Sequence, residues 1–306
     1  MVLKAYSRRT LNMYAKTVAD AFWSKTDAFP MLTVNDIFVV FQSLMGISIT
    51  KINTLRQAII AFQTGAGILE PPFEAKGVQL LFRALKKAAP LKPLPKLPLD
   101  GDIAFRVFNF WADKPSKDDQ RNAAFLTLQL ASMHRFEEVA LCRREHLRDC
   151  GSRGFVWTVP RSKTEQFGRG HEVHLPPTMG GLQVAQVLRI FLRMAPNDGG
   201  FLFRPTTPDK QSWVSRFKSN KSEAKLNNQK WNNDLRVALQ QSCGEVDPRR
   251  FSSHSVRSGA TTSLLDQGVP LDDCRLLLRH KSTTAVLRYH KELPQHSRGL
   301  LARIFT

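Results

Sequence analysis

Residues 252–291 combine histidine, arginine and tyrosine at spacings that suit phosphoryl transfer. His254 and Arg257 are three residues apart, so one turn of a helix presents both side chains on the same face. His280 and Tyr289 follow, nine residues apart, with a Ser-Thr-Thr run between them that can begin a helix. A guanidinium stays charged and can bind two phosphate oxygens at once, while a tyrosine hydroxyl can attack phosphorus. The segment therefore predicts a site that acts on a phosphodiester.

Two segments further upstream carry side chains of the same kind. Residues 131–141, ASMHRFEEVAL, contain Arg135 and, three positions later, Glu138. Residues 161–176, RSKTEQFGRGHEVHLP, contain Lys163 next to a predicted β-hairpin turn, because glycines separate two runs of apolar and β-branched residues.

Together these segments resemble the tyrosine recombinase family, the phage-integrase-like enzymes. The family pattern is His-x-x-Arg, a helix, Gly-Val, a second helix, His or Trp, and a nucleophilic Tyr. Residues 254–289 follow this pattern in the same order. The box around the family's first arginine is similar to residues 131–141 and identifies Arg135, and the family's hairpin lysine corresponds to Lys163. The catalytic similarity covers roughly residues 99–295, and the similarity further upstream is architectural.

The resemblance implies that the chain cleaves and rejoins DNA strands through a 3′-phosphotyrosine. Tyr289 would attack phosphorus. Arg135 and Arg257 would clamp the non-bridging oxygens, where negative charge accumulates in the transition state. The clustered cations would also lower the pKa of the attacking hydroxyl. No metal ion or other cofactor is expected.

The other polar side chains would assist this reaction. His254 is the candidate general base, because an imidazole titrates near neutrality. Lys163 would protonate the leaving 5′ oxygen, and His280 would donate a hydrogen bond to the phosphate. Glu138 would orient a neighbouring group, either His254 or a helix end.

The overall composition favours a nucleic-acid partner. Lys and Arg number 45 against 26 Asp and Glu, giving a net charge of +19 and a pI near 10.2. Such an excess usually matches a polyanion, most often DNA or RNA. The sequence has no evident lipidation signal, secretory signal or membrane-spanning run, so an intracellular, DNA-associated protein without a membrane partner is expected. Its four cysteines form no Cys-x-x-Cys pair that would predict a zinc or redox site.

The chain is expected to be mostly α-helical with a small β-sheet, in two domains. Residues 1–88 should form a bundle of four short helices, which the resemblance makes a SAM-like core-binding domain. Residues 89–98 alternate proline with lysine or leucine and should form an extended linker. Residues 99–306 should form a mixed α/β catalytic domain that ends in an apolar, helix-like tail, and the two domains would clamp the duplex.

Apolar periodicity and capping residues predict the individual elements. Helices of the first domain should follow Ser7 and Thr33, open at Thr50 and run from about Glu74 to Lys87. Elements of the second domain are expected as helices at 101–113 and 118–133, strands at 155–160 and 172–175, and helices after Pro177, around His254, after Val269 and after Ser282. Residues 204–236 are polar and basic and could be a DNA-contacting insertion or a disordered loop.

Basic side chains outside the catalytic set are candidates for contacts with double-stranded DNA. They are Arg56, Lys86, Lys87, Lys92, Lys96, Arg161 and Arg169. The family cuts with two protomers on each site and assembles four for strand exchange, which implies a homodimer on each site and a homotetramer in the synaptic complex. The apolar tail, residues 293–306, would dock on a neighbouring protomer or on its own domain.

Two positions depart from the family pattern. Met133 belongs to a Met-His-Arg run where the family commonly has Gly before a small apolar residue, and Arg279 replaces a common Gly before His280. Both changes concern the local backbone and leave the charged chemistry intact.

Three other functions remain as alternatives. A catalytically inactive or domesticated recombinase-derived DNA-binding protein would share the fold, but Tyr289 together with both arginines argues against it. A type IB topoisomerase-like enzyme shares the chemistry and relaxes DNA alone, but the integrase-like N-terminal region argues against this. An unrelated RNA-binding basic protein would form no covalent adduct and would not prefer duplex DNA.

Overall fold

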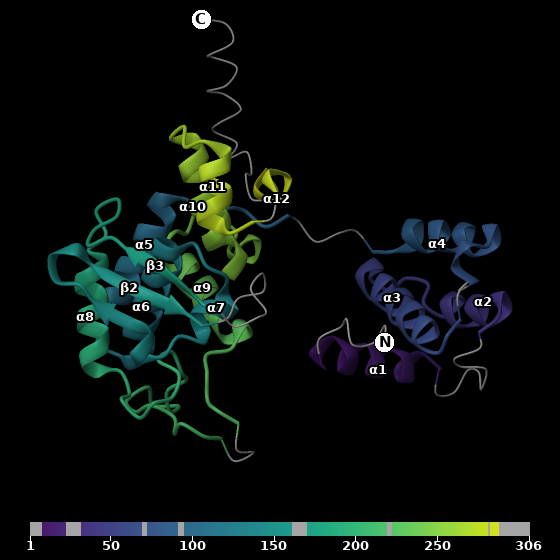
Figure 1. The fold of residues 1–306 in the computed structure, drawn as a ribbon, viewed down its shortest axis with the longest axis horizontal. Helices are drawn as coiled ribbons and strands as arrows, with labels where there is room; N and C mark the ends of the chain where they lie inside the picture. The colour runs from purple at the N-terminus through teal and green to yellow at the C-terminus, as the bar shows by residue number, and fades with distance from the viewer. Residues whose placement is uncertain are drawn as a thin grey trace, which may run out of the picture. The chain divides into compact units, whose positions relative to one another are not determined.

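The computed structural model describes residues 8–22, 32–68, 72–90, 95–160, 170–218, 222–280 and 282–287. The chain divides into two compact units, residues 1–93 and 94–306, each with its own apolar core (Figure 1). Helices dominate both units, and a small three-stranded sheet completes the second. The expected fold class is confirmed. Within the described ranges, no helix combines the length and the hydropathy needed to cross a membrane.

The first unit is a bundle of four α-helices. They are α1 (Arg8–Phe22), α2 (Val34–Gln42), α3 (Ile49–Gly65) and α4 (Lys76–Ala88), with a 3₁₀-helix, η2 (Pro72–Glu74), before α4. Thr33 and Asp36 form a capping box at the start of α2, since each side chain accepts a hydrogen bond from the other's backbone N–H. Phe41, Phe73 and Phe82 pack with ring centroids 4.8–6.3 Å apart and fasten α4 to α2.

The helix α3 begins at Ile49 after Ser48, one residue before the expected start at Thr50. The carbonyl of Thr50 accepts the hydroxyl of Thr54 one turn later. All four predicted helices of this unit are confirmed, and each begins within two residues of its expected start.

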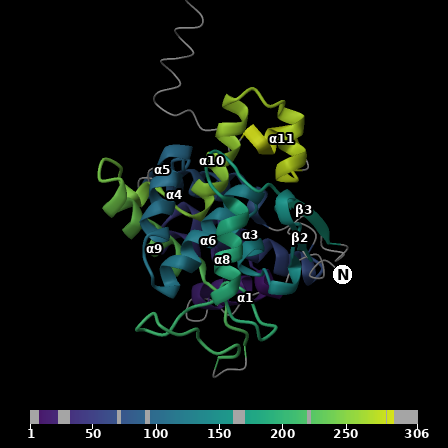
Figure 2. The ribbon, with the colours of Figure 1, turned by 90° about the vertical axis from the view of Figure 1, so that its left-hand side faces the viewer.

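The second unit is organised around α6 (Lys117–Ser132), which is buried along most of its length. The helices α5, α8 and α10 and the strand β3 pack against it (Figure 2). The helices other than α6 are α5 (Gly101–Ala112), α7 (Phe136–Ala140), α8 (Val184–Met194), α9 (Asn228–Ser242), α10 (Ser253–Asp266), α11 (Leu271–Leu278) and α12 (Thr283–Leu287).

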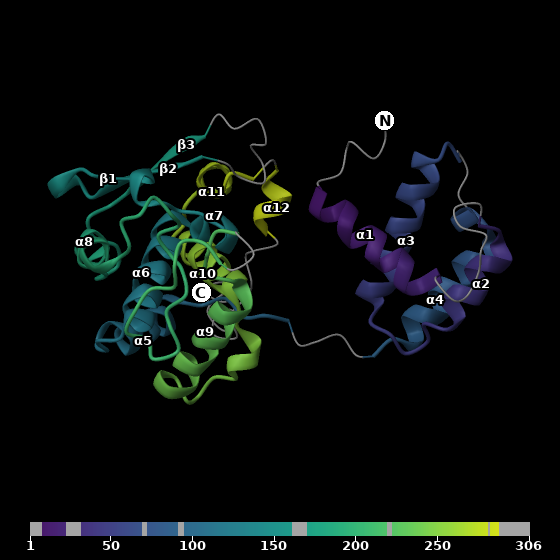
Figure 3. The same cartoon turned by 90° about the horizontal axis from the view of Figure 1, so that it is seen from below.

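An antiparallel sheet of three strands lies at one edge of this unit (Figure 3). Its strands, in sheet order, are β1 (Leu147–Asp149), β2 (Phe155–Val159) and β3 (His171–Leu175). Val159 pairs with His171 next to the loop that connects β2 to β3. Both predicted strands are confirmed within one residue, whereas β1 was not expected, because three mostly polar residues show no alternation. The predicted turn at 165–170 lies outside the described residues except for Gly170.

The end of the proline-rich segment is fastened to the second unit. The backbone N–H groups of Leu97 and Leu99 donate to the carbonyls of Arg250 and Ser255, each at 2.8 Å. Gly259 in α10 permits this approach, because a Cβ at that position would lie only 1.7 Å from the carbonyl oxygen of Leu99. The segment therefore lies directly against the helix that carries Arg257.

The polar segment between α8 and α9 is ordered without regular helices. In its described part, residues 195–218 and 222–227, ion pairs hold the chain together. The guanidinium of Arg204 is buried and binds Asp198, and Arg143 binds Glu223. From Asn228 onward the chain is α9. The alternative of a disordered loop is therefore wrong for the described part of residues 204–236.

Gly259→Ala is expected to lower the free energy of unfolding of the second unit by at least about 1–3 kcal/mol. The methyl group of the alanine would force the Leu99 backbone away from α10. The measurement is urea denaturation followed by tryptophan fluorescence. Gly101→Ala, in α5, is the matched control, since its Cβ would meet nothing within 4 Å. Its change should stay below about 1 kcal/mol. Equal midpoints for the two variants would contradict the close approach.

Candidate active site

Arg257 is the buried centre of the candidate site. Its side chain extends from the second turn of α10, and the residue is only 3% exposed. Nη1 donates to the carbonyl oxygen of Met133 at 2.8 Å, and Nη2 donates to that of Leu278 at 2.5 Å. Burial of a cation is costly unless its donors are paired. Pairing this guanidinium therefore fixes two loops, one after α6 and one after α11.

Both loops turn through a left-handed residue. Met133 at the end of α6 has φ = 53°, and Arg279 at the end of α11 has φ = 55°. Helices often end this way, but usually with glycine, because a side chain costs about 1–2 kcal/mol in this conformation. These are the two positions where the family commonly has glycine. The substitutions therefore keep the glycine-like backbone, and the loop carbonyls still reach Arg257.

Arg135 is positioned by Glu138 at the start of α7. The Glu138 carboxylate accepts the backbone N–H of Arg135 at 2.8 Å and its Nη1 at 3.2 Å. Burial alone would raise the pKa of Glu138, but the Arg135 N–H and the charges of His134, Arg135 and Arg257 lower it overall. Glu138 is thus held as a carboxylate, and its contacts with the backbone and side chain of Arg135 orient that residue.

His280 contacts Arg257 and lies within the electrostatic field of Arg135. Its Nε2 is 3.1 Å from Nη2 of Arg257, so in this arrangement the ring nitrogen accepts a hydrogen bond from the guanidinium. Burial and the charges of Arg257 and Arg135 lower the pKa of His280 to about 4, with Glu138 acting in the opposite direction. A neutral imidazole thus lies in the field of two fixed cations. The expected donation from His280 to a phosphate would use a different hydrogen-bond arrangement.

The structure places the remaining predicted residues as follows. His254 is exposed in the first turn of α10, one turn before Arg257. Lys163 and Tyr289 lie outside the described residues. The last described residues before Tyr289 belong to α12, where buried Val286 packs with Cys274 and Leu278. The structure therefore brings together four of the predicted residues, which are Arg135, Glu138, Arg257 and His280.

The candidate DNA-binding residues have different surroundings. Arg56 lies over the rings of Phe73 and Phe82, at 5.6 and 5.4 Å, so its cation also contributes to packing in the first unit. Lys86 and Lys87 are exposed in the last turn of α4. Lys96 donates to the carbonyl of Arg249. Lys92, Arg161 and Arg169 lie outside the described residues.

The sequence interpretation did not recognise a second polar cluster beside the site. His134, His171 and Arg279 come from three segments, and a ring nitrogen of His171 contacts both His134 and Arg279. Two departures from the family pattern could have pointed to this cluster. They are Met133-His134 before Arg135 and Arg279 before His280. Nothing in the spacing linked either to His171.

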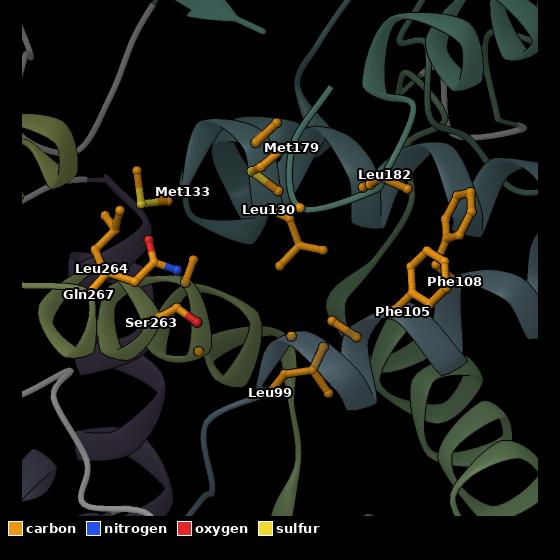
Figure 4. Close-up of a pocket in the computed structure, with 16 residues that line it drawn as sticks. Leu99, Phe105, Phe108, Leu130, Met133, Met179, Leu182, Ser263, Leu264 and Gln267 are labelled. Atoms are coloured by element: carbon orange, nitrogen blue, oxygen red, sulfur yellow. The ribbon is translucent and has the colours of Figure 1, made fainter. Parts of the chain in front are cut away.

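Two other features do not provide phosphoryl-transfer chemistry. A cavity of about 340 Å³ lies between α5, α6 and α10 (Figure 4), and its lining, which includes Leu130, Met133 and Leu264, contains no charged side chain. In the ranges that the structure describes, no group of three or more His, Cys, Asp or Glu side chains is arranged to hold a metal ion.

Comparison with known proteins gives one family. The model of the Phage integrase family matches residues 104–296, which is more than half of the chain and includes every predicted catalytic residue. No curated protein matches the sequence.

Several solved structures have a similar fold. The Tn1549 transposon integrase in complex with transposon right end DNA has a TM-score of 0.62 at 14% identity, over 98% of this chain and 93% of that one. XerH site-specific recombinase bound to palindromic difH substrate has a TM-score of 0.60 at 12% identity, over 96% and 78%. A lambda integrase dimer bound to a COC′ core site has 0.58 at 14%, over 94% and 72%. At these identities the likeness concerns the fold.

The stability of the protein should fall as the pH is lowered from about 6.5 towards 4. His280 and His171 each have a folded-state pKa of about 4, whereas an unfolded histidine titrates near 6.5. In this window the unfolded chain binds protons that the folded chain does not, so the free energy of unfolding decreases with falling pH. Urea denaturation at several pH values measures this slope. His280→Gln should reduce it, and an unchanged slope would contradict the position of His280 beside Arg257 and in the field of Arg135.

Proposed function

This chain belongs to the phage integrase family and is a tyrosine-type site-specific recombinase, and we propose that it breaks and rejoins DNA through a 3′-phosphotyrosine on Tyr289. The observation that carries the proposal is the gathering of Arg135 and Arg257 around the neutral His280, with each guanidinium held by its own hydrogen bonds before any substrate binds. Such an arrangement suits an anionic group whose charge increases during the reaction.

The arginines would stabilise the pentacoordinate phosphorus. Arg257 is held by two backbone carbonyls and Arg135 by a carboxylate, so neither guanidinium needs to reorganise as charge develops. Transition-state stabilisation of this kind contributes about 3–4 kcal/mol for each well-placed donor.

The covalent step would exchange one phosphoester for another. The Tyr289 oxygen forms a bond to phosphorus while the bond to the 5′ oxygen breaks. His254 takes the proton of the tyrosine hydroxyl, and Lys163 gives a proton to the leaving oxygen. Attack by a 5′ hydroxyl on the phosphotyrosine reverses these transfers and restores a phosphodiester. The bond energy is conserved, so no external energy source is needed.

The proposed partner is double-stranded DNA, bound by a clamp of two domains, residues 1–88 and 99–306, joined by the linker 89–98. The net charge of +19 and the exposed Lys86 and Lys87 support this partner. The similar Tn1549 integrase is in complex with transposon right end DNA, and XerH is bound to its difH substrate. The lambda integrase is a dimer bound to a core site. We extend this to a homodimer on each site and a homotetramer in the synaptic complex.

The direct test incubates the protein with a pool of nicked duplex suicide substrates in EDTA and looks for a protein–DNA adduct that survives SDS. The wild type should form this adduct and Tyr289→Phe should not, because phenylalanine lacks the attacking oxygen. Tyr14→Phe is the matched control, since Tyr14 packs in the core of the first unit, and it should retain the adduct.

Two other outcomes would overturn the proposal. Binding of duplex DNA without any adduct across the pool would identify an inactive DNA-binding relative. Relaxation of nonspecific supercoiled plasmid by the monomer would identify a topoisomerase-like activity.

A further inference from the structure

Ser253, in the first turn of α10, is held by side-chain amides from two other helices. Both α6 and α9 pack against α10 (Figure 3). The backbone N–H of Ser253 donates to Oδ1 of Asn232 at 2.7 Å, and its hydroxyl donates to Oδ1 of Asn228 at 3.1 Å. Its carbonyl oxygen accepts from Nε2 of Gln129 at 3.1 Å. The peptide groups on both sides of this buried residue are therefore fixed by partners outside α10.

The backbone N–H of Ser253 determines how the two asparagine amides are oriented. A backbone N–H can only donate, so Asn232 turns its oxygen towards Ser253 and its NH₂ group away. This NH₂ group donates to Oδ1 of Asn228 at 2.6 Å. The same oxygen of Asn228 accepts the hydroxyl of Ser253, because a carbonyl oxygen has two lone pairs. Each donor of this network thus faces an acceptor.

Neither Asn228 nor Asn232 is needed to begin the helix that carries it. Asn227 caps α9, since its side chain accepts the backbone N–H of Lys230 at 2.7 Å. Asn228 and Asn232 are four residues apart in α9, so they share one face of the helix. Asparagine is a poor helix former, so its use inside α9 is consistent with a tertiary function. The contacts of this face serve α10.

The helix α10 carries two of the predicted catalytic side chains, and they are held in different ways. Carbonyl oxygens of two loops fix the guanidinium of Arg257. The side chain of His254 is exposed, and the backbone that carries it decides which positions its ring can reach. The peptide group between Ser253 and His254 is the one whose oxygen accepts from Gln129. The amides around Ser253 therefore act on His254 independently of the loops that hold Arg257.

We propose that Asn232 is a positioning residue for strand cleavage, which acts by fixing the backbone that carries His254. This inference rests on the proposed function, in which His254 takes the proton of the Tyr289 hydroxyl. Loss of the Asn232 amide would leave the buried N–H of Ser253 without this acceptor, which is costly, so the first turn of α10 would shift or fray. Arg257 would keep its contacts with the two loops. A misplacement of about 1 Å can lower a reaction rate by about 100-fold.

The test follows covalent adduct formation on the nicked suicide substrates at saturating DNA, as a single-turnover rate constant and as a final amplitude. Asn232→Ala should lower the rate constant by about 10- to 100-fold, with wild-type amplitude and with duplex affinity within several-fold of wild type. A purely structural defect would instead lower the folded fraction, and with it the amplitude. Alanine is the better helix former, so α9 itself should not be weakened. Asn233→Ala, at the exposed next position of α9, is the matched control and should keep the wild-type rate constant.

The decisive background is His254→Ala, which removes the group that Asn232 is proposed to position. In this background the further effect of Asn232→Ala on the rate constant should be within about 2-fold, because the two residues act as one unit. An equal loss from Asn232→Ala with His254 and with His254→Ala would overturn the proposal. A wild-type rate constant for Asn232→Ala alone would overturn it as well.

Asn228 supplies a second pair of variants, should Asn232→Ala fail to fold. The contacts of Asn228 with Asn232 and Ser253 both use its oxygen as the acceptor, so Asn228→Asp can keep them, whereas Asn228→Ala removes them. Asn228→Ala should lower the rate constant by about 10-fold, and Asn228→Asp should stay within several-fold of wild type. Equal rate constants for these two variants would contradict the proposal. A wild type without any adduct would overturn the proposed function and this inference with it, whereas a wild-type adduct with unaffected variants would overturn the inference alone.

Discussion

The structure depends on one buried guanidinium whose hydrogen bonds are made to backbone carbonyls of two separate loops. The carbonyls of Met133 and Leu278 each accept a hydrogen bond from the guanidinium of Arg257. The position of this cation is therefore fixed before an anion arrives. The loop after α6 leads directly into Arg135, and the loop after α11 leads into His280. One interaction thus places the three charged or polar groups on which the proposed chemistry relies.

Packing elsewhere in the second unit offsets the free-energy cost of this arrangement. Met133 and Arg279 hold a backbone conformation that disfavours side chains, and burial of the arginine adds to that cost. The close packing of α6, α10 and the segment at Leu99, with a glycine at the contact, holds the loops in place. Glu138 acts locally in the same way, since its carboxylate both caps α7 and orients Arg135. Stability elsewhere thus maintains a site that is unfavourable by itself.

The sequence predicted much of this molecule, for identifiable reasons. Long helices and the β2–β3 hairpin have clear periodicity, and the family pattern has enough elements in order to predict Arg135, Arg257 and His280 as site residues, which the structure brings close together. The strand β1 could not be predicted because its three residues show no pattern of their own. The partner of Glu138 was ambiguous because a helix-capping contact and a contact with His254 have similar sequence signatures. The contact of His171 with Arg279 spans 108 residues and depends on tertiary packing.

The most direct test of the central claim is the single-turnover rate of covalent adduct formation by Arg257→Lys at saturating DNA. A lysine ammonium keeps the charge but cannot reproduce the planar fork that binds two loop carbonyls while facing a phosphate. The account predicts that the rate falls by about 100-fold or more, with duplex affinity within several-fold of wild type. A rate within a few-fold of wild type would show that a positive charge alone suffices at this position, and would contradict the role assigned to the anchored guanidinium.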